Sequence, residues 1–421
     1  MSAPRAVKGM HDLLPDRTAH AAWLEARFRE VARRWGFGEI RTPVVEPTEL
    51  FVRSIGESTD IVEKEMYSFV DKGQDALTLR PEGTAGVVRA YVEHAVWTQE
   101  PVTRWIYMGP MFRRERPARG RYRQFHQLGA ELFGDPGPYA DAELIDMLVT
   151  FLREAGVADV EVLLNSLGGP EARRAYRHAL VEYLEPRRPA LSADSQRRLA
   201  SNPLRVLDSK APEDREVVAH APRITDFLNA EDRAHLDGLR AALDRLQVPH
   251  RLEPTLVRGL DYYDRTLFEV RGRGGELGAQ DAVCGGGRYD GLVETMGGPP
   301  TPAVGFAIGL ERLMLLAPPP PPPPGTDVFV VAVGAAERLE AAVIARELRA
   351  EGLSVETDLR GGSLRSQLRR ADRVGARLAL LVGSDELARG VVQLRDLRAG
   401  RQREVGRDAL RAAIRAERSA T

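Results

Sequence analysis

The sequence predicts an α+β protein made of a larger β-rich part with a helical insertion and a smaller C-terminal α/β module. At 421 residues the chain is long enough for two or three domains. Turn signals between segments rich in aromatic and β-branched residues predict antiparallel strands in the larger part. Residues 170–247 instead combine helical spacing with many charges, which predicts the insertion. An unbroken proline run at 318–324 then predicts a stiff spacer before the module.

The expected domain boundaries follow from these changes of pattern. The β-rich domain takes residues 1–165 and 255–317, and the helical insertion takes 166–254. The proline-rich linker takes 318–325, and the α/β domain takes 326–421. A proline-rich loop inside a single domain is the alternative for the linker. It is disfavoured because a new pattern of strands and helices begins directly after the run.

Two helices are expected in the β-rich domain. The first spans residues 18–35 and ends before Gly36. Its expected inward residues are Leu24, Phe28, Val31 and Trp35. The second spans residues 141–155. Its expected inward residues are Leu144, Leu148, Phe151 and Leu152.

The C-terminal module begins with a continuous apolar run at 328–333, which is typical of a strand buried on both faces. A helix is expected over 337–351, with Leu339, Val343 and Leu348 on one side. The further expected elements are a strand near 353–357, a helix near 363–374 and a strand near 378–382.

The composition excludes several classes of protein. With 43% hydrophobic and 29% charged residues, the chain is neither wholly disordered nor collagen-like. It contains no apolar run near the ~20 residues that a membrane span needs, and residues 1–9 lack the apolar core of a secretory leader. The single cysteine, Cys284, excludes an intrachain disulfide and a four-cysteine zinc site. Because the net charge is −1, any binding of nucleic acid depends on local patches.

Common phosphate and metal motifs are missing from the sequence. There is no GxxxxGK[ST] loop, no GxGxxG that opens a helix after a strand, and no HExxH pair. A glycine run at 285–287 fits a tight turn about as well as it fits a functional glycine-rich segment.

Residues 107–131 predict an antiparallel hairpin, because turn signals at 117–120 separate two strand-like segments. Side chains alternate along a strand, so Phe125, Gln127, Gly129 and Glu131 share one face of the second strand. That face presents an aromatic ring, an amide and a carboxylate in a row. Such a surface can stack on a base and bind a polar small molecule.

The segment 80–84 (RPEGT) is a shaped loop that presents the carboxylate of Glu82 beside the hydroxyl of Thr84. A carboxylate and a hydroxyl held together in this way suit a cationic amine. An ordinary polar loop is the alternative, and the five residues alone do not exclude it.

Two later segments carry cationic and phenolic groups. In residues 256–263, Arg258 and two tyrosines surround Gly259, which permits a close approach of the backbone. Residues 303–313 predict a strand that runs into a helix, with Arg312 in the first turns. An arginine at that place can face a polyphosphate.

In this order and combination, the segments resemble the histidyl-tRNA synthetases, a family of class II aminoacyl-tRNA synthetases, over nearly the whole chain. The matching segments are 8–12 (KGMHD, the opening segment), 39–43 (EIRTP, motif 1), 107–133 (motif 2), 303–315 (motif 3), and 256–269 with 284–292 (the two stretches peculiar to histidine enzymes). Residues 202–205 and 207–210 fit the helical insertion of the family.

The resemblance implies a class II antiparallel sheet flanked by helices, with a helical insertion and a C-terminal α/β domain that binds the anticodon. It implies that the enzyme activates L-histidine with ATP and transfers it to the 3′ end of tRNA(His). The proline of motif 1 lies at the dimer interface in this family, so a homodimer is implied. The implied cofactor is Mg²⁺ with ATP, with no protein-bound zinc, no membrane and a cytoplasmic location.

The resemblance also implies residue roles. Arg113 and Arg258 are the implied catalytic residues, on two sides of the α-phosphate. The implied histidine-binding residues are Glu82, Thr84, Gln127, Glu131, Tyr262 and Tyr263. The implied ATP-binding residues are Arg113, Glu115, Phe125 and Arg312. Arg116 and Arg119, in the loop of motif 2, are the candidates for the acceptor end of tRNA.

Two alternatives belong to other classes. Catalytically silent paralogues of this family serve as regulatory subunits of a histidine-biosynthetic transferase, and they generally lack the tail domain and the arginine–tyrosine constellation. This chain keeps both, including Arg258, Tyr263 and Arg312. A class I synthetase or P-loop enzyme is disfavoured because the sequence has neither a HIGH-type nor a KMSKS-type pattern.

Overall fold

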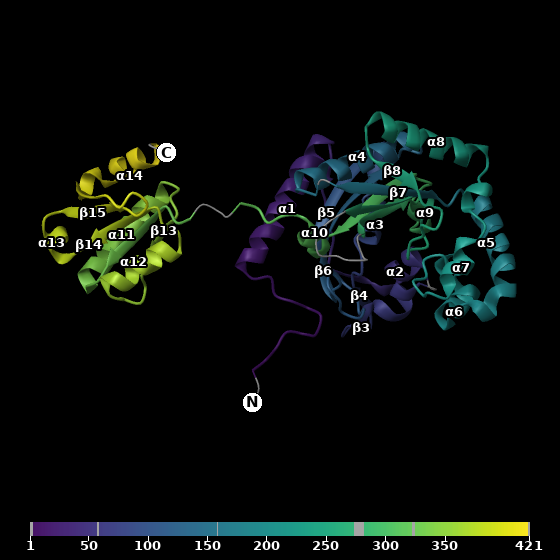
Figure 1. Ribbon diagram of the computed structural model, residues 1–421, viewed down its shortest axis with the longest axis horizontal. Helices are drawn as coiled ribbons and strands as arrows, with labels where there is room; N and C mark the ends of the chain where they lie inside the picture. The colour runs from purple at the N-terminus through teal and green to yellow at the C-terminus, as the bar shows by residue number, and fades with distance from the viewer. Residues whose placement is uncertain (1–2, 57–58, 158, 273–281, 322–324, 420–421) are drawn as a thin grey trace. The chain divides into compact units, whose positions relative to one another are not determined.

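The computed structural model describes residues 3–56, 59–157, 159–272, 282–321 and 325–419. They belong to two compact units, Met1–Pro320 and Pro321–Thr421 (Figure 1). Part of the expected proline spacer, residues 322–324, lies outside the described residues. Within the described part of the chain, no helix is both long and apolar enough to span a bilayer.

The first unit is built on an eight-stranded sheet with the order β1-β5-β6-β11-β10-β9-β7-β8. The central pairs are antiparallel, and β1 and β8 join the two edges in parallel. The strands are β1 (Gly38–Glu39), β5 (Thr103–Phe112), β6 (Gln124–Phe133), β7 (Val160–Ser166), β8 (His250–Leu252), β9 (Asp264–Gly272), β10 (Ala282–Arg288) and β11 (Ala303–Gly309). The predicted α+β class is therefore confirmed, as is the 107–131 hairpin.

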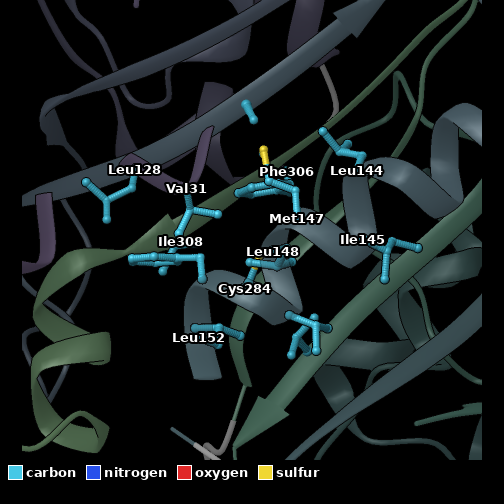
Figure 2. Close-up of a cluster of buried hydrophobic side chains, with 14 of the residues drawn as sticks. Val31, Leu128, Leu144, Ile145, Met147, Leu148, Leu152, Cys284, Phe306 and Ile308 are labelled. Atoms are coloured by element: carbon cyan, nitrogen blue, oxygen red, sulfur yellow. The ribbon is translucent and has the colours of Figure 1, made fainter. Parts of the chain in front are cut away.

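One face of this sheet packs on two helices, α1 (Pro15–Arg34) and α4 (Pro138–Glu154). Phe28 of α1 contacts Phe151 of α4 and Phe306 of β11, with ring centroids 5.0 and 6.3 Å apart. Figure 2 shows this core, in which the lone cysteine, Cys284, is buried among aliphatic side chains. The inward residues predicted for the two helices are buried except Trp35, which caps the end of α1 and is half-buried.

The opposite face of the sheet carries α2 (Thr48–Ile55), α3 (Thr84–Glu93) and α9 (Leu292–Thr295). The short helix α10 (Leu310–Leu316) instead packs with α1 on the first face, through Leu310 and Leu313. A small antiparallel sheet, β2-β4-β3, lies next to α2 in the chain. Its strands are β2 (Val45–Pro47), β3 (Tyr67–Val70) and β4 (Ala76–Leu79).

The predicted insertion is helical. Its helices are α5 (Pro170–Leu184), α6 (Ala193–Ser201), α7 (Asp214–Ala219) and α8 (Ala230–Arg245), drawn in teal in Figure 1. Two helix starts are capped by side chains, since Ser192 accepts a bond from the amide of Ser195, and Asn229 accepts one from Asp232. A separate apolar cluster holds α5 to α6 and to the turn at Pro203–Val206. The insertion therefore has a core of its own.

The second unit has the sheet order β13-β12-β14-β15-β16, in which β13, β12 and β14 pair in parallel and β15 pairs antiparallel with both β14 and β16. Its strands are β12 (Val328–Ala332), β13 (Val355–Thr357), β14 (Leu378–Val382), β15 (Val391–Asp396) and β16 (Gln402–Gly406). Its helices are α11 (Ala335–Ala350), α12 (Leu364–Arg373), α13 (Ser384–Ala388) and α14 (Leu410–Ser419).

One detail of the sequence-based interpretation is wrong. Leu339 and Val343 do not share a side of α11 with Leu348: they are 71% and 40% exposed, and Leu348 is buried. The helical rotation between positions 343 and 348 is too large for a common face. Of the two interpretations left open for the glycine run at 285–287, the tight turn is excluded, because the run lies inside strand β10.

Candidate active site

A cleft of about 650 Å³ opens on the sheet face that does not pack on α1 and α4. Ten residues with predicted roles line it: Glu82, Thr84, Arg113, Glu115, Phe125, Gln127, Arg258, Tyr262, Tyr263 and Arg312. Glu131 lies behind the wall, fully buried, and bonds to Thr84. Arg116 and Arg119 are exposed on the loop between β5 and β6 and do not line the cleft.

The cleft exists because the strands beneath it alternate large and small residues. On β11, Val304, Phe306 and Ile308 enter the core, so Gly305 faces the opposite side. A Cβ on Gly305 would lie 1.6 Å from the Glu131 carboxylate, which shows that the missing side chain makes the room. On β10, a Cβ on Gly285 would lie 1.7 Å from the Arg258 guanidinium. The glycines therefore give the site its depth.

The first turn of α3 holds the end of the cleft at Glu82 and Thr84. The Glu82 carboxylate accepts hydrogen bonds from the amides of Thr84 and Ala85, each at 2.7 Å. It thereby satisfies two donors at the start of the helix. Burial raises the pKa of Glu82, and these amide bonds oppose the shift. Gln127 faces the same space, and its buried Oε1 has no hydrogen-bond partner among the described residues.

Behind this wall, Glu131 is enclosed by hydroxyl groups. The Thr84 hydroxyl donates to its carboxylate at 2.7 Å, and the Tyr289 hydroxyl donates to the other oxygen. Burial raises the pKa of Glu131 to about 8, although both bonds lower it. The Tyr262 ring lies 4.6 Å from Tyr263 and 5.6 Å from Tyr289. Carboxyl and phenol groups thus form one continuous cluster, from the buried Glu131 to Tyr262 at the surface of the cleft.

The segment with Arg258, Tyr262 and Tyr263 is fixed by the insertion. Arg173 of α5 donates to the carbonyl oxygens of Asp261 and Tyr263, each at 3.0 Å. Asn202 donates to the Asp261 carboxylate at 2.9 Å. The insertion therefore sets the backbone that presents Arg258 and the tyrosines.

Arg258 itself is held by an ion pair across the sheet. Its Nη1 lies 3.0 Å from Glu269 Oε2, while Arg271 Nε lies 3.0 Å from Glu269 Oε1. One carboxylate on β9 therefore orients two guanidinium groups on the same side of the cleft.

Further cations line the same cleft. Arg113 donates to the Pro81 carbonyl at 2.8 Å and lies over the Phe125 ring at 5.3 Å from the centroid. Burial lowers the pKa of Arg312, and the nearby Arg121 and Arg258 lower it further. Guanidinium groups that repel one another in a half-buried cleft form a site for a polyanion.

Strand β6 is also tied to the helix that carries Arg312. Glu311 accepts bonds from the His126 amide at 2.9 and 3.0 Å and from its ring Nδ1 at 2.8 Å. The bond to Glu311 raises the pKa of His126 despite burial. Phe125 and Arg312 are neighbours of these two residues, so their relative position is fixed by this contact.

Sequence reasoning did not select four residues that build the site: Tyr107, Glu269, Tyr289 and Glu311. Tyr107 was open to prediction, since it pairs with Gly129 in the hairpin and shares its face. A Cβ on Gly129 would lie 2.1 Å from the Tyr107 ring. The other three depend on which strands become neighbours.

Among the described residues, no group of three or more His, Cys, Asp or Glu side chains is placed to hold a metal.

An antiparallel sheet that presents arginines beside a buried polar pocket, together with a separate α/β domain, is the arrangement that the resemblance to class II aminoacyl-tRNA synthetases implies. The family model for histidyl-tRNA synthetase matches residues 9–313, and a model for an anticodon-binding domain matches 327–417. The chain is 54% identical over 401 residues to the histidine–tRNA ligase of Sorangium cellulosum, covering 95% of this chain and 94% of that protein.

Solved structures agree. The apo histidyl-tRNA synthetase of S. aureus superposes with a TM-score of 0.80 at 34% identity, covering 97% of this chain and 98% of that one. A protein of Bacillus halodurans described as an ATP phosphoribosyltransferase regulatory subunit/histidyl-tRNA synthetase is more distant, with a TM-score of 0.62 and 25% identity over 86% of this chain and 95% of that one. This chain belongs to the histidyl-tRNA synthetase family.

Proposed function

We propose that the chain is a histidine–tRNA ligase that activates L-histidine with ATP and then charges tRNA(His). The observation that carries the proposal is the juxtaposition, in one cleft, of a buried polar pocket around Glu131 and a cationic wall that includes Arg113, Arg258 and Arg312. The pocket suits an imidazole, and the arginines suit a triphosphate. Both substrates of the first step can therefore occupy the same cleft.

In the first step, a carboxylate oxygen of histidine attacks the α-phosphorus of ATP. The bond to the β-phosphate oxygen breaks, and its electron pair leaves with pyrophosphate. Arg113 and Arg258 hold the α-phosphate from two sides and stabilise the charge that grows on its oxygens. Arg312 and Glu115 bind other parts of the nucleotide, and the adenine ring stacks on Phe125. The chemistry needs mainly positioning and fixed charge. ATP brings its Mg²⁺ as part of the substrate.

Histidine is recognised by polar groups at one end of the cleft. Glu131 and Tyr263 bind the two imidazole nitrogens, with Tyr262 beside them. Because Glu131 is fully buried and bonded to Thr84 and Tyr289, the ring displaces one of these hydroxyl partners when it binds. Glu82, Thr84 and Gln127 hold the α-amino group, and the unpartnered buried oxygen of Gln127 supports a donor at that place. An analogue without the ring nitrogens would leave buried polar groups unpaired, which is the strongest basis for rejection of a substrate of similar shape.

In the second step, the terminal ribose hydroxyl of tRNA attacks the histidyl carbonyl and AMP leaves. We assign adenylate formation to residues 1–165 and 255–317, and anticodon binding to residues 326–421. The insertion, 166–254, orders the histidine-binding segment, and 318–325 link the two functions. The second unit contains 18 Arg and 14 acidic residues, and this excess of positive charge supports contact with RNA. Arg116 and Arg119 are exposed on their loop and can meet the acceptor end.

We also propose that the enzyme is a cytoplasmic homodimer. Motif 1 lies beside the small sheet, where Val45 and Phe69 share one face and are 38% and 45% exposed. Apolar side chains that gather at one surface support an interface. We assign a cytoplasmic location because tRNA charging supplies translation there. The lone buried thiol of Cys284 also suits a reducing compartment.

The test is the exchange of labelled pyrophosphate into ATP. Histidine should support exchange, while 1-methylhistidine, in which a methyl group blocks one ring nitrogen, should not. Purified tRNA(His) should then accept labelled histidine. A regulatory subunit would show no exchange, so a fully folded protein without histidine-dependent exchange would overturn the proposal.

A further inference from the structure

The segment ahead of α1 contains a residue that is buried among exposed neighbours. Residues 7–12, termed here the N-terminal strap, form one turn in which the Met10 amide donates to the Val7 carbonyl at 2.9 Å. Val7 is 61% exposed and Lys8 is exposed, but Gly9 between Lys8 and Met10 is buried. The surface that covers Gly9 is the loop of residues 113–123, which connects β5 to β6.

Contacts between the strap and the loop involve both limbs of the loop. On the returning limb, the Arg123 amide donates to the Gly9 carbonyl at 2.7 Å, and Arg123 Nη1 donates to the Lys8 carbonyl at 3.3 Å. The His11 ring packs edge-on against Tyr122, with centroids 5.0 Å apart. Pro117 of the outgoing limb contacts Gly9. The strap therefore touches the loop on both sides of its tip.

Only glycine fits at position 9. Its φ angle is +87°, a conformation that L side chains rarely adopt. A Cβ there would also lie 2.8 Å from Pro117 Cγ and 3.0 Å from Arg123 Cγ. A side chain at this position would thus push the strap and the loop apart.

The other side of the same loop faces the cleft, where Glu115, Arg121 and Tyr122 are lining residues. Arg123 links the two sides, because its Nε donates to the Glu115 carbonyl at 3.2 Å while its Nη1 bonds to the strap. The base of the loop is closed by the Arg113 amide, which donates to the Arg123 carbonyl at 3.0 Å. Movement of Arg123 would therefore move Glu115 and Arg113.

We propose that the N-terminal strap is a positioning element for ATP: it holds the 113–123 loop in the conformation that places Arg113 and Glu115 against the nucleotide. The inference rests on the proposed function. Histidine binding does not depend on the strap, because Glu131, Thr84 and Tyr263 lie on the sheet, on α3 and on the segment held by the insertion. The strap thus acts on one substrate of the pair.

The experiment compares Gly9→Ala with Gly36→Ala in the full-length chain. Both glycines have a positive φ, +87° and +77°, so alanine brings similar backbone strain at each position. At Gly36, however, an added Cβ has nothing within 4 Å. In pyrophosphate exchange, we expect Gly9→Ala to raise the KM for ATP about fivefold or more while the KM for histidine stays within about twofold. Gly36→Ala should change neither.

A further variant keeps the test decisive if Gly9→Ala folds poorly, and a double variant tests the cause of the effect at Gly9. His11→Ala removes the contact with Tyr122 without backbone strain and should raise the KM for ATP about twofold or more. In the double variant Gly9→Ala/Pro117→Ala, the loss of Pro117 Cγ removes the closest overlap, at 2.8 Å, while that with Arg123 Cγ stays. The KM for ATP should therefore return part of the way towards that of Pro117→Ala alone.

The outcomes separate the two proposals. Absence of histidine-dependent exchange in the unmodified chain would overturn the proposed function, and the role of the strap with it. Normal exchange in the unmodified chain, with an equal KM for ATP in the Gly9 and Gly36 variants and in His11→Ala, would overturn the strap alone. An equal rise of both KM values in Gly9→Ala would mean general damage to the cleft and would also overturn it.

Discussion

Replacing Arg258 by alanine removes a charge that the proposed mechanism needs most in the transition state. Its side chain is 27% exposed, so solvent screens it only in part. Removal of one preorganised donor at a developing oxyanion typically lowers kcat by about 10²- to 10³-fold, or about 3–4 kcal/mol. Because of the partial screening we expect the lower end, a loss of about 100-fold in histidine-dependent exchange. The Kd for histidine should change much less, since the imidazole contacts remain.

Arg271→Ala is the matched control for this experiment. Arg271 pairs with the same carboxylate, Glu269, at the same distance of 3.0 Å, and its side chain is 36% exposed. It has no assigned role at the α-phosphate, so its removal should lower exchange by no more than about fivefold, the value of a partly exposed ion pair. Single-turnover adenylate formation and equilibrium binding of histidine measure the two quantities separately. Equal losses in the two variants, or a loss of histidine affinity as large as the loss of rate, would refute the role of Arg258.

The remaining predictions concern the pH response, the domain division and the stability of the first unit. The pKa of Glu131 is raised to about 8 in the folded state, so the stability that its proton provides is present at low pH and is lost as the pH rises from about 4.5 to about 8. The stability of Glu131→Gln relative to the unmodified chain should therefore increase over that range in urea unfolding, and a constant difference would contradict this. Removal of residues 326–421 should spare histidine-dependent exchange and mainly reduce tRNA charging; loss of exchange in a folded product would refute the division. Arg288 is fully buried and bonds to Asp141, also fully buried, so Arg288→Ala should destabilise the first unit by about 3–5 kcal/mol. All four tryptophans lie in this unit, so their fluorescence follows its unfolding alone. An unchanged midpoint of urea unfolding in Arg288→Ala would contradict this prediction.

Local pattern was enough to predict the elements whose neighbours in space are also neighbours in sequence. The β5–β6 hairpin and the passage from β11 into α10 are of this kind, because the alternation of side chains and a single turn define them. The face with Phe125, Gln127 and Glu131 could therefore be assigned in advance. The roles of these residues came from the family resemblance and remain predictions.

What could not be predicted depends on the order of strands. Glu269 and Tyr289 contribute to the site because the sheet has the order β6-β11-β10-β9, which brings their segments next to the hairpin. No local pattern encodes this order. The glycine run in β10 was ambiguous for the same reason: glycine in a strand and glycine in a turn look alike until the neighbouring side chains are known. The strap is a third case, since Gly9 meets a loop more than 100 residues further along the chain.

The depth of the site has one physical origin that links these cases. A flat antiparallel sheet covered by ordinary side chains offers no cavity for two substrates. Here Gly129, Gly285 and Gly305 leave space on three neighbouring strands, and that space is filled by polar groups: Tyr107 against Gly129, Arg258 against Gly285 and Glu131 against Gly305. Because each glycine would place its Cβ within about 2 Å of its partner, replacement by alanine must displace the functional side chain rather than merely crowd it. The glycines and the polar groups therefore depend on each other. The glycines leave the space in which the polar side chains lie, and the polar side chains determine what the cleft binds.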